Sequence, residues 1–283
     1  MALPATEPHN RLERGAKGAE VEALQALLNR VGALLSTDGD FGGGTEGALR
    51  EAQMLAGLPV NGAADAATWQ WLENQPEPSG IIPTEAVTFI VREEVGGRKF
   101  YDEHVAMPHF PGEASGVTIG VGYDLRFQEP QDFEADWTGI LTPAQMDALR
   151  PHLGKKGSQG AVNALSNLRI PFHAAWKVFV KRALPRGIEQ TESCYGDLAK
   201  LPPLCRGALV SLVYNRGTKL SGDSRREMKA IRDHIAGGAL DEVAAEFERM
   251  KRLWPGSEGL RKRRDKEAAM WRQGLAQAGP PGA

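Results

Sequence analysis

The sequence contains few cysteines, few aromatic residues and no long hydrophobic run. Only Cys194 and Cys205 occur among its 283 residues, so a disulfide scaffold is excluded. We expect both thiols to be free and buried, since a single bridge would form only in an oxidising compartment. No run of about 18 apolar residues exists, and so no segment is expected to span a membrane.

The first residues also lack the marks of an export signal. Met1 to Asn10 show neither a basic start nor an apolar stretch, so no secretory signal is expected. We therefore expect synthesis in the cytoplasm, and any exit from it to need outside help.

Composition otherwise matches a globular protein, with 41% apolar and 25% charged residues. At roughly 100 to 200 residues per domain, the chain should hold about two domains. The net charge differs between the two parts of the chain. Residues 1–85 contain 5 Lys/Arg and 12 Asp/Glu, a net charge of −7, whereas residues 86–283 contain 29 Lys/Arg and 24 Asp/Glu, a net charge of +5. A basic second part would be attracted to nucleic acid or the cell envelope, although a solvated basic surface is the simpler explanation of charge alone.

A proline-rich stretch separates the two parts. Residues 76–85 hold three prolines and one glycine without an apolar period, and proline withholds a backbone donor and restricts the residue before it. The stretch predicts a linker rather than a helix or strand. We expect a first domain at 9–75, this linker, a second domain at 86–275 and a flexible tail at 276–283.

Three short helices are predicted in the first domain. Apolar residues recur at helical spacing in three groups, separated by the turn sequences DGDFGGGT and LPVNG. Such helices form a marginal core, and a unit of that size usually exists to bind something. The three groups are Val21, Leu24, Leu27 and Leu28; Ala48, Leu49 and Met54; Ala67, Trp69 and Leu72.

An ordered pattern runs through the same region: Leu12, Gly15, Gly18, Val21, Leu24, Gln25, Leu28, Asp38 to Gly42, Thr45, Ala48, Gln53, Gly57, Leu58, Asn61, Gly62, Thr68 and Leu72. This pattern resembles the peptidoglycan-binding domain of the three-helix type over about residues 9–75. Asn61 stands where the family usually has Asp, and Asn-Gly serves the same turn because both residues tolerate a left-handed backbone. The resemblance implies that the first domain binds the cell wall.

The second domain opens with an amphipathic helix that ends in a carboxylate. Val87, Ile90, Val91 and Glu94 lie at i, i+3, i+4 and i+7, so Glu94 closes an apolar stripe. A carboxyl held against an apolar surface resists ionisation and can keep a proton near neutrality, as a general acid must. Glu93 points about 100° away and is expected to be the more solvated neighbour.

A glycine-rich segment follows this helix. A pair of glycines should end the helix, and in Ser115 to Asp124 apolar residues then alternate with Thr118 and two glycines. That alternation has the period of a strand with one face nearly bare, where a ligand or another backbone can approach closely. We expect Thr118 and Asp124 to bracket this strand beside Glu94.

A second pattern runs through these segments: Glu94, Tyr101, Thr118 to Tyr123, and Asp124. It resembles the phage-type lysozymes, in particular the branch that includes the bacteriocin pesticin. In the T4-like branch an Asp lies nine positions after the Glu, and here that position is Glu103. The pesticin-like branch places its Asp six residues after the Thr, and Asp124 fits that spacing. We therefore prefer Asp124 over Asp102 or Glu103.

Two later stretches extend the resemblance across residues 84–273. Residues 207–217 are similar to the apolar helix behind the lysozyme cleft and its Asn-containing turn, and residues 259–271 are similar to the closing helix, of the form GLxxRRxxE. Taken alone, the first stretch could be explained as the core face of a helix and the second as a solvated basic helix face. Both stretches nevertheless follow the Glu94, Thr118 and Asp124 set in the order that the family has. The resemblance implies that three residues contact the substrate, namely Tyr101, Tyr123 and Asn215.

The resemblance implies a mainly α protein, in which a small three-helix binding domain is joined to an α+β lysozyme-like domain with a small β-lobe. It implies hydrolysis of the β-1,4 bond between N-acetylmuramic acid and N-acetylglucosamine. Glu94 would be the acid, while Asp124 and Thr118 would hold the attacking water, which suggests inversion at the anomeric carbon. The distance between the two carboxyl groups in the folded protein distinguishes inversion from retention. Peptidoglycan is the expected partner, and a monomer is expected.

The linker would keep the catalytic cleft close to a wall that the first domain has bound. Removal of residues 1–80 is therefore expected to lower activity on intact walls more than on short soluble glycans.

Other chemistries find little support. No HExxH occurs among the six histidines, and His104 and His109 are expected in a loop without a helical ligand face. GEASG has the wrong register for GxSxG, and neither a dinucleotide fingerprint nor a phosphate loop is present. The basic run RKRRDKE lacks the interleaved aromatics of nucleic-acid binders. No cofactor, metal, nucleic acid or membrane insertion is expected.

Other functions than that of a muramidase also fit the sequence. A lytic transglycosylase uses one Glu and releases an anhydro-sugar, although Thr118 and Asp124 argue against it. A non-catalytic wall-binding protein would only hold glycan. A muramidase could be a phage endolysin, released by a holin to act in the periplasm or cell wall, or a secreted antibacterial effector or bacteriocin.

Overall fold

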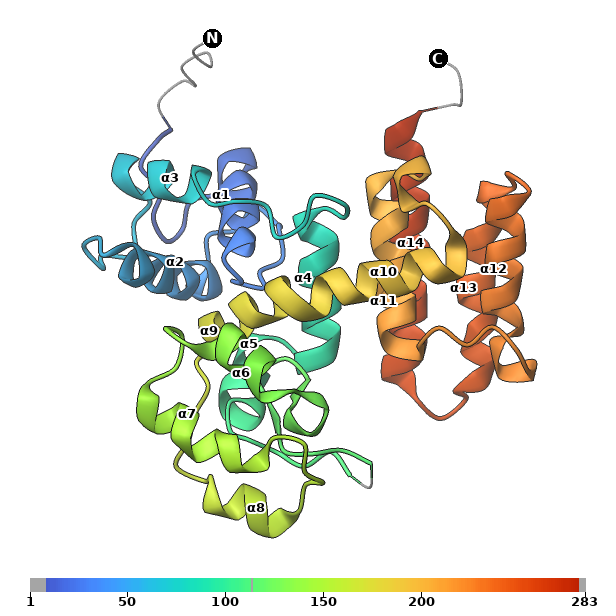
Figure 1. The fold of residues 1–283 in the computed structure, drawn as a ribbon. Helices are drawn as coiled ribbons and strands as arrows, with labels where there is room; N and C mark the ends of the chain where they lie inside the picture. The colour runs from blue at the N-terminus through green and yellow to red at the C-terminus, as the bar shows by residue number, and fades with distance from the viewer. Residues whose placement is uncertain (1–8, 113, 280–283) are drawn as a thin grey trace.

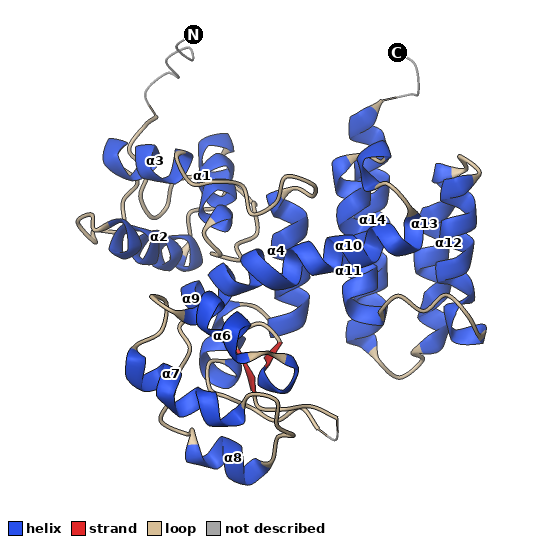
Figure 2. Cartoon of the chain, viewed as in Figure 1, coloured by secondary structure: helices blue, strands red, loops and turns tan. Residues whose placement is uncertain are grey.

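The computed structural model describes residues 9–112 and 114–279, and it is mainly helical (Figures 1 and 2). A single pair of short strands is present in the described residues, β1 (Thr118–Ile119) and β2 (Tyr123–Asp124). The predicted mainly α architecture with a small β element is confirmed. The α-helices are α1 (Ala19–Arg30), α2 (Gly43–Ala56), α3 (Ala66–Glu73), α4 (Thr84–Val95), α5 (Arg98–Phe100), α6 (Pro130–Trp137), α7 (Pro143–Leu149), α8 (Gln159–Ala164), α9 (Phe172–Val178), α10 (Leu184–Tyr195), α11 (Pro203–Arg216), α12 (Arg226–Ala236), α13 (Val243–Arg249) and α14 (Glu258–Ala278).

Two π-helical turns and several 3₁₀ turns join these helices. Because η4 continues α9 directly into α10, one helical rod crosses the molecule from the green lobe to the orange lobe of Figure 1. The π turns are η1 (Tyr101–Val105) and η4 (Phe179–Ala183), and the 3₁₀ turns are η2 (Leu125–Phe127), η3 (Arg150–His152), η5 (Leu198–Lys200), η6 (Asp223–Arg225), η7 (Leu240–Glu242) and η8 (Met250–Leu253).

The three predicted N-terminal helices are present as α1, α2 and α3. Local signals explain their ends: Gly57 adopts a left-handed conformation (φ 67°) after α2, and the Asp65 side chain accepts a hydrogen bond from Thr68 N (2.9 Å) before α3. The helices bury a small core of their own, which includes Leu24, Leu49, Trp69 and others.

Residues 76–83 of the predicted linker form no helix or strand, whereas Thr84 and Glu85 belong to α4, and the segment is not a free tether. Ile82 is 2% exposed and belongs to the larger core of the second part. Arg206 Nη1 also donates a hydrogen bond to Ile81 O (3.1 Å). The segment is therefore packed onto the second part of the chain, and α4 already begins at Thr84.

The two parts contact each other directly. Trp176 of α9 lies against Gly32, where an added Cβ would be 2.8 Å from the indole, and its Nε1 donates to Arg30 O (3.3 Å). Arg98 Nη1 forms an ion pair with Glu51 of α2 (2.7 Å). A tryptophan covered in this way joins the first part to the core of the second.

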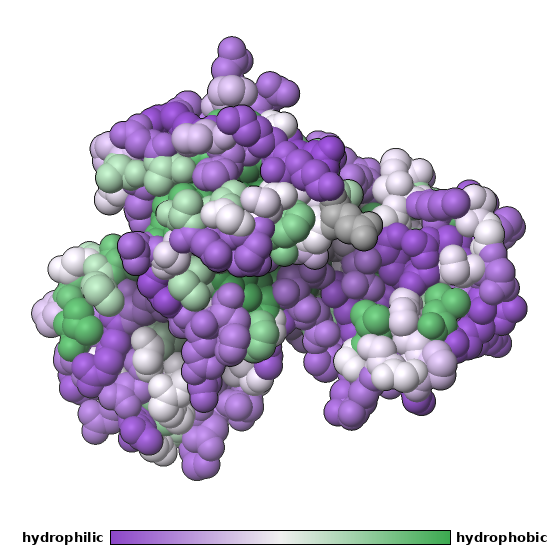
Figure 3. Space-filling model, turned by 90° about the horizontal axis from the view of Figure 1, so that it is seen from below, coloured by the Kyte–Doolittle hydropathy of each residue, from purple (hydrophilic) through white to green (hydrophobic). Residues whose placement is uncertain are grey.

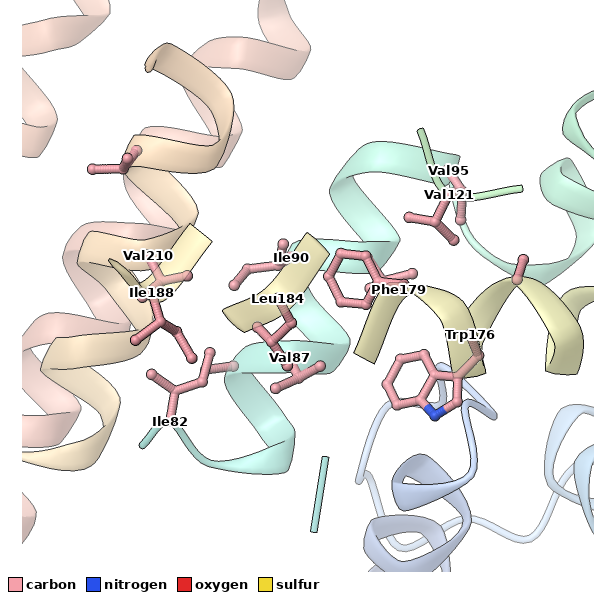
Figure 4. Close-up of a cluster of buried hydrophobic side chains, with 14 of the residues drawn as sticks. Ile82, Val87, Ile90, Val95, Val121, Trp176, Phe179, Leu184, Ile188 and Val210 are labelled. Carbon is pink, nitrogen blue, oxygen red and sulfur yellow. The ribbon is translucent and has the colours of Figure 1, made fainter. Parts of the chain in front are cut away.

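The larger core is organised around α4. Figure 4 shows Val87 and Ile90 of α4 facing Leu184 of the helical rod, with Val210 of α11 nearby. α4 and α11 approach so closely that a Cβ on Gly207 would lie 2.3 Å from Ala86 Cβ. This close packing holds the first turn of α4 against α11.

Helices α11 to α14 form the orange and red lobe of Figure 1. Seen from below, hydrophilic residues cover most of the molecule and apolar residues form small separate patches (Figure 3). None of the helices in the described part of the chain combines the length and apolar composition needed to cross a membrane. α14 continues to Ala278, so the predicted start of a tail at residue 276 is wrong, and residues 280–283 lie outside the described residues.

Candidate functional site

Glu94 lies at the C-terminal end of α4. Gly96 adopts a left-handed conformation (φ 69°) directly after the helix, as the glycine pair predicted. The stripe that includes Val87 and Val91 is buried, and Glu94 projects from its end with 29% of its side chain exposed. The helix thus presents one carboxylate at the edge of the core.

Glu93 is less exposed than Glu94, contrary to expectation. Its side chain is 17% exposed, and its carboxylate accepts a hydrogen bond from Lys266 Nζ of α14 at 2.6 Å. The prediction that Glu93 is the more solvated carboxylate is wrong because α14 lies beside α4 and covers that face.

An arginine from α14 holds Glu94. Arg263 Nη1 donates a hydrogen bond to Glu94 Oε1 at 2.7 Å, and the arginine side chain is only 4% exposed. Its Nη2 donates to Ser211 O and Oγ, both at 3.2 Å. Among the described residues, Glu94 Oε2 accepts no hydrogen bond. Oε2 is therefore the oxygen of this carboxyl that remains available to a ligand.

The GLxxRRxxE stretch builds the network behind Glu94. Glu267 Oε1 accepts hydrogen bonds from Ser211 Oγ (2.6 Å) and Arg264 Nη2 (2.8 Å), and Arg263 Nε lies 3.4 Å away. Arg264 Nη2 also donates to Asn215 Oδ1 (3.2 Å). Burial raises the pKa of Glu267 and lowers the pKa of Arg264, and their mutual attraction opposes both shifts.

Tyr214 of α11 lies beside the β-hairpin, and the charge of Glu94 acts on its hydroxyl. Burial is the main reason that the pKa of its hydroxyl is raised, and the Glu94 charge adds to it while Arg263 opposes it. The hydroxyl would lie 3.8 Å from a Cβ on Gly122, and the ring would lie 3.4 Å from one on Gly187. These two glycines leave space for the phenol.

The glycine-rich segment forms a tight hairpin rather than the predicted single strand. Gly120 (φ 57°) and Gly122 (φ 71°) adopt the positive φ that turns the chain back on itself. β1 and β2 pair in antiparallel fashion, with Thr118 opposite Asp124. Directly opposite residues share a face, about 5 Å apart at Cβ, so the six-residue spacing brings these two side chains together.

The Asp124 carboxylate is occupied by backbone groups. Its Oδ1 accepts hydrogen bonds from Gly116 N and Arg126 N, both at 2.9 Å, and Oδ2 lies 3.1 Å from Gly116 N. Asp124 thereby caps η2 and holds the loop before β1.

Thr118 has a buried hydroxyl that accepts and donates no hydrogen bond in the described structure. The residue is 4% exposed, and its backbone pairs with His109 through bonds of 2.8 and 3.0 Å. His109 Nδ1 is likewise buried without a partner. Burial lowers the pKa of His109, and the Asp124 charge opposes that shift. His109, Thr118 and Asp124 thus form a row across the hairpin.

The structure brings Thr118 and Asp124 together, but in the described residues no hydrogen bond or ion pair joins either of them to Glu94. Val95 and Val121 belong to the same buried cluster, so the hairpin turn and the end of α4 share one core (Figure 4). A groove of about 270 Å³ opens beside Tyr214, between the hairpin and α10.

Three residues were predicted to contact substrate, and their positions differ. Tyr101 is fully buried and its hydroxyl donates to Ile170 O (2.9 Å), so this prediction is wrong: the residue completes the core. Tyr123 lines the groove, although its hydroxyl donates to Asp136 (3.1 Å). Asn215 is partly buried and serves the network behind Glu94.

The carboxylates that were not preferred lie on η1. Asp102 is 53% exposed and pairs with Arg98 at 3.6 Å, and Glu103 is 51% exposed and pairs with Lys99 at 3.9 Å. Both are surface ion pairs of adjacent helical turns.

Within residues 9–112 and 114–279, no three His, Cys, Asp or Glu side chains gather closely enough to hold a metal ion. Both cysteines are free and buried, as predicted. Burial raises the pKa of the Cys205 thiol to about 12, and its Sγ donates to Trp271 O (3.3 Å). Neither thiol is presented as a nucleophile.

Sequence reasoning missed Arg263 as the partner of Glu94. The two residues are 169 positions apart, so no local spacing connects them. The RRxxE stretch is the signal from which the contact between Arg263 and a carboxylate could have been inferred. Two adjacent arginines on a buried helix face require carboxylates as partners, because an unpaired buried charge is strongly destabilising.

Two families match parts of the chain. Residues 17–72 match the family described as "Putative peptidoglycan binding domain", which confirms the resemblance predicted for the first part. Residues 86–170, which contain Glu94, Thr118 and Asp124, match the family described as "Domain of unknown function (DUF8812)". No curated protein matches the chain.

Among solved structures, the chain is similar to one titled "Crystal structure of Burkholderia AP3 phage endolysin", at 16% sequence identity. The comparison covers 96% of this chain and 100% of that chain, with a TM-score of 0.23. The chain thus carries a segment similar to peptidoglycan-binding domains, and this segment supports a function at the bacterial cell wall.

Proposed function

We propose that the protein is an endolysin-like muramidase that hydrolyses the β-1,4 bond between N-acetylmuramic acid and N-acetylglucosamine, with Glu94 as the general acid. The observation that carries the proposal is the arrangement of the Glu94 carboxyl. Arg263 binds Oε1 at 2.7 Å and orients the carboxyl, whereas Oε2 has no hydrogen-bond partner in the part of the chain that the structure describes. Glycoside hydrolysis needs such an oriented acid to protonate the leaving oxygen.

Thr118 and Asp124 are proposed to hold the attacking water. The buried Thr118 hydroxyl has no protein partner among the described residues, so its hydrogen-bonding capacity is unused and would serve a water molecule that enters the site. Asp124 lies opposite on the same face of the hairpin and would orient that water. A water placed against the sugar face opposite the acid would give inversion.

The N-terminal segment supports peptidoglycan as the polymer. Residues 17–72 match a peptidoglycan-binding family, and they are docked on the catalytic part through Trp176. A binding unit beside a hydrolase raises the local concentration of the bond to be cut. We propose an endolysin that acts in the periplasm or cell wall, and a secreted effector with the same activity is the alternative role.

A lytic transglycosylase is the second candidate reaction, and one observation favours it. The Asp124 carboxylate is already occupied by backbone donors, and the Thr118 hydroxyl is enclosed, which is the pattern of two structural residues. Glu94 would then act alone, and the product would be an anhydro-sugar. Mass spectrometry of the digest distinguishes the two reactions, because the anhydro product is lighter by one water.

The replacement Glu94→Gln tests the proposal. The amide keeps the size of the side chain and a carbonyl oxygen for Arg263, but it cannot donate the proton. We expect the rate of clearing of purified cell wall to fall by about 10²- to 10⁴-fold while the melting temperature changes little.

The matched control is Glu93→Gln, on the next residue of α4, which should retain nearly full activity because its partner is Lys266. Wall clearing by Glu94→Gln at a rate close to that of the unmutated protein would falsify the assignment.

A further inference from the structure

The groove beside Tyr214 has the polar lining of a binding site. Its walls come from the hairpin (Gly122 and Tyr123), from the helical rod (Arg186 and Gln190) and from α11 (Tyr214). The volume of about 270 Å³ suits a small polar group rather than a whole sugar chain.

Several polar groups in this groove are free. In the described residues, the side chains of Arg186 and Gln190 and the Tyr214 hydroxyl form no hydrogen bond or ion pair. Gln128 donates its Nε2 to Asp124 O (3.0 Å), which leaves its amide oxygen available. Polar groups that converge on one hollow without protein partners are placed for a ligand.

The free charge of the groove is positive. Arg182 also lines it, but its Nε donates to the buried Asp136, which neutralises it. Arg186 has no such partner among the described residues, and Glu189, one turn further along α10, does not form an ion pair with it. A guanidinium matches the geometry of a carboxylate, to which it can donate two parallel hydrogen bonds.

Tyr214 connects the groove with the surroundings of Glu94. Tyr214 lines the groove, and the Glu94 charge acts on the hydroxyl of the same residue. A ligand group in the groove would therefore contact Tyr214, the residue on which the charge of the proposed acid acts.

We propose that this groove binds a free carboxylate of the peptide that branches from the glycan of peptidoglycan, with Arg186 as the charged contact. The inference rests on the proposed function. The sugars themselves carry no charge where the lactyl group is amide-linked to the peptide, so the free carboxylates of the polymer belong to the peptide. A peptide attached to a sugar at the cleavage site would enter the groove past Tyr214.

The test measures equilibrium binding of two soluble muropeptides by calorimetry. The full chain carrying Glu94→Gln is used so that the ligands are not cleaved. One ligand is the disaccharide tetrapeptide with free carboxylates, and the other is the same compound with its peptide carboxylates amidated. We expect Arg186→Ala to weaken binding of the first ligand about tenfold and to leave binding of the second unchanged. Lys200→Ala removes the same charge from an exposed site on η5 and should change neither affinity.

Three results would overturn the inference. These are equal losses on both ligands, an equal loss in Lys200→Ala, and an absence of binding of the first ligand by the parent chain. Wall clearing by the chain with Glu94 intact is measured in parallel. That assay decides the proposed function separately, because its outcome does not depend on Arg186.

Discussion

At the scale of single residues, Thr118 carries a cost that the fold does not explain. A buried hydroxyl without a partner is destabilising by about 1–3 kcal/mol relative to one that is hydrogen-bonded. Thr118 Oγ1 is such a group, although valine would fill the same space in a strand. A hydroxyl kept at this cost is consistent with a role toward a water molecule or a substrate.

The replacement Thr118→Val separates that role from stability. We expect the free energy of unfolding to stay the same or rise by about 1 kcal/mol, because no hydrogen bond is lost. We expect hydrolysis of cell wall to fall at least tenfold, measured by product release at equal protein concentration.

The control for this substitution is Thr191→Val on α10. Thr191 Oγ1 donates to Gly187 O at 2.7 Å, so its loss should destabilise the protein by about 1 kcal/mol without changing the chemistry. Full wall-degrading activity in Thr118→Val would remove the hydroxyl from the mechanism, and release of the anhydro product would then favour the transglycosylase.

At the scale of elements, the sequence predicted what local signals determine. The end of α4 follows from Gly96 and its left-handed conformation. The three N-terminal helices follow from apolar spacing and from turn residues such as Gly57. The placement of Glu94 at the end of an apolar stripe was therefore correct.

What the sequence could not predict depends on long-range packing. Alternating residues in Ser115 to Asp124 fit a strand, but the positive φ of Gly120 and Gly122 converts the segment into a hairpin. Tyr101 belongs to the sequence pattern that resembles the lysozyme substrate site. Its hydroxyl nevertheless donates a hydrogen bond to Ile170 O, 69 positions away, and the residue lies in the core. Burial of that kind is not visible in spacing.

The close approach of α4 and α11 gives a prediction at this scale. A Cβ on Gly207 would lie 2.3 Å from Ala86 Cβ, so Gly207→Ala must push the two helices apart. We expect a loss of about 1–3 kcal/mol of stability in chemical denaturation. Activity should also fall, because Glu94 on α4 would move relative to its partners.

Gly259→Ala on α14 is the matched substitution, since an added Cβ there meets no atom within 4 Å. It should be neutral or stabilising by about 0.5–1 kcal/mol. Equal stability of the two variants would contradict the importance of the α4–α11 contact.

At the scale of the whole molecule, the two parts pack against each other through a direct interface and are not separate domains on a flexible linker. Trp176 is 4% exposed and lies against Gly32, and the Arg98–Glu51 ion pair spans the same boundary. Leu34 from the first part even belongs to the core of the second. Removal of the first part therefore does more than remove a wall-binding unit.

Deletion of residues 1–80 should lower the melting temperature of the remaining chain, because it exposes the Trp176 side chain. Covering a large apolar side chain contributes about 1.5–3 kcal/mol. Calorimetry of the full and shortened chains measures the difference. A shortened chain that unfolds at the same temperature as the full protein would show that the joint contributes nothing to stability.

A second variant separates stability from wall binding. Gly32→Val keeps the first part but places a side chain where the indole of Trp176 lies, at a backbone φ of 89°. It should lower stability while retaining more activity on intact walls than the deletion does. On short soluble glycans, the two variants should differ little.

The joint at Trp176 also sets a geometric limit on where the molecule can cut. The Arg98–Glu51 ion pair and the Trp176 hydrogen bond to Arg30 O join the two parts, so in this structure the first part lies at a defined offset from Glu94. Under the proposed function, the distance between the glycan strand bound by the first part and the bond that is cleaved would be set by the packing of the two parts. It would not vary with the motion of a flexible linker.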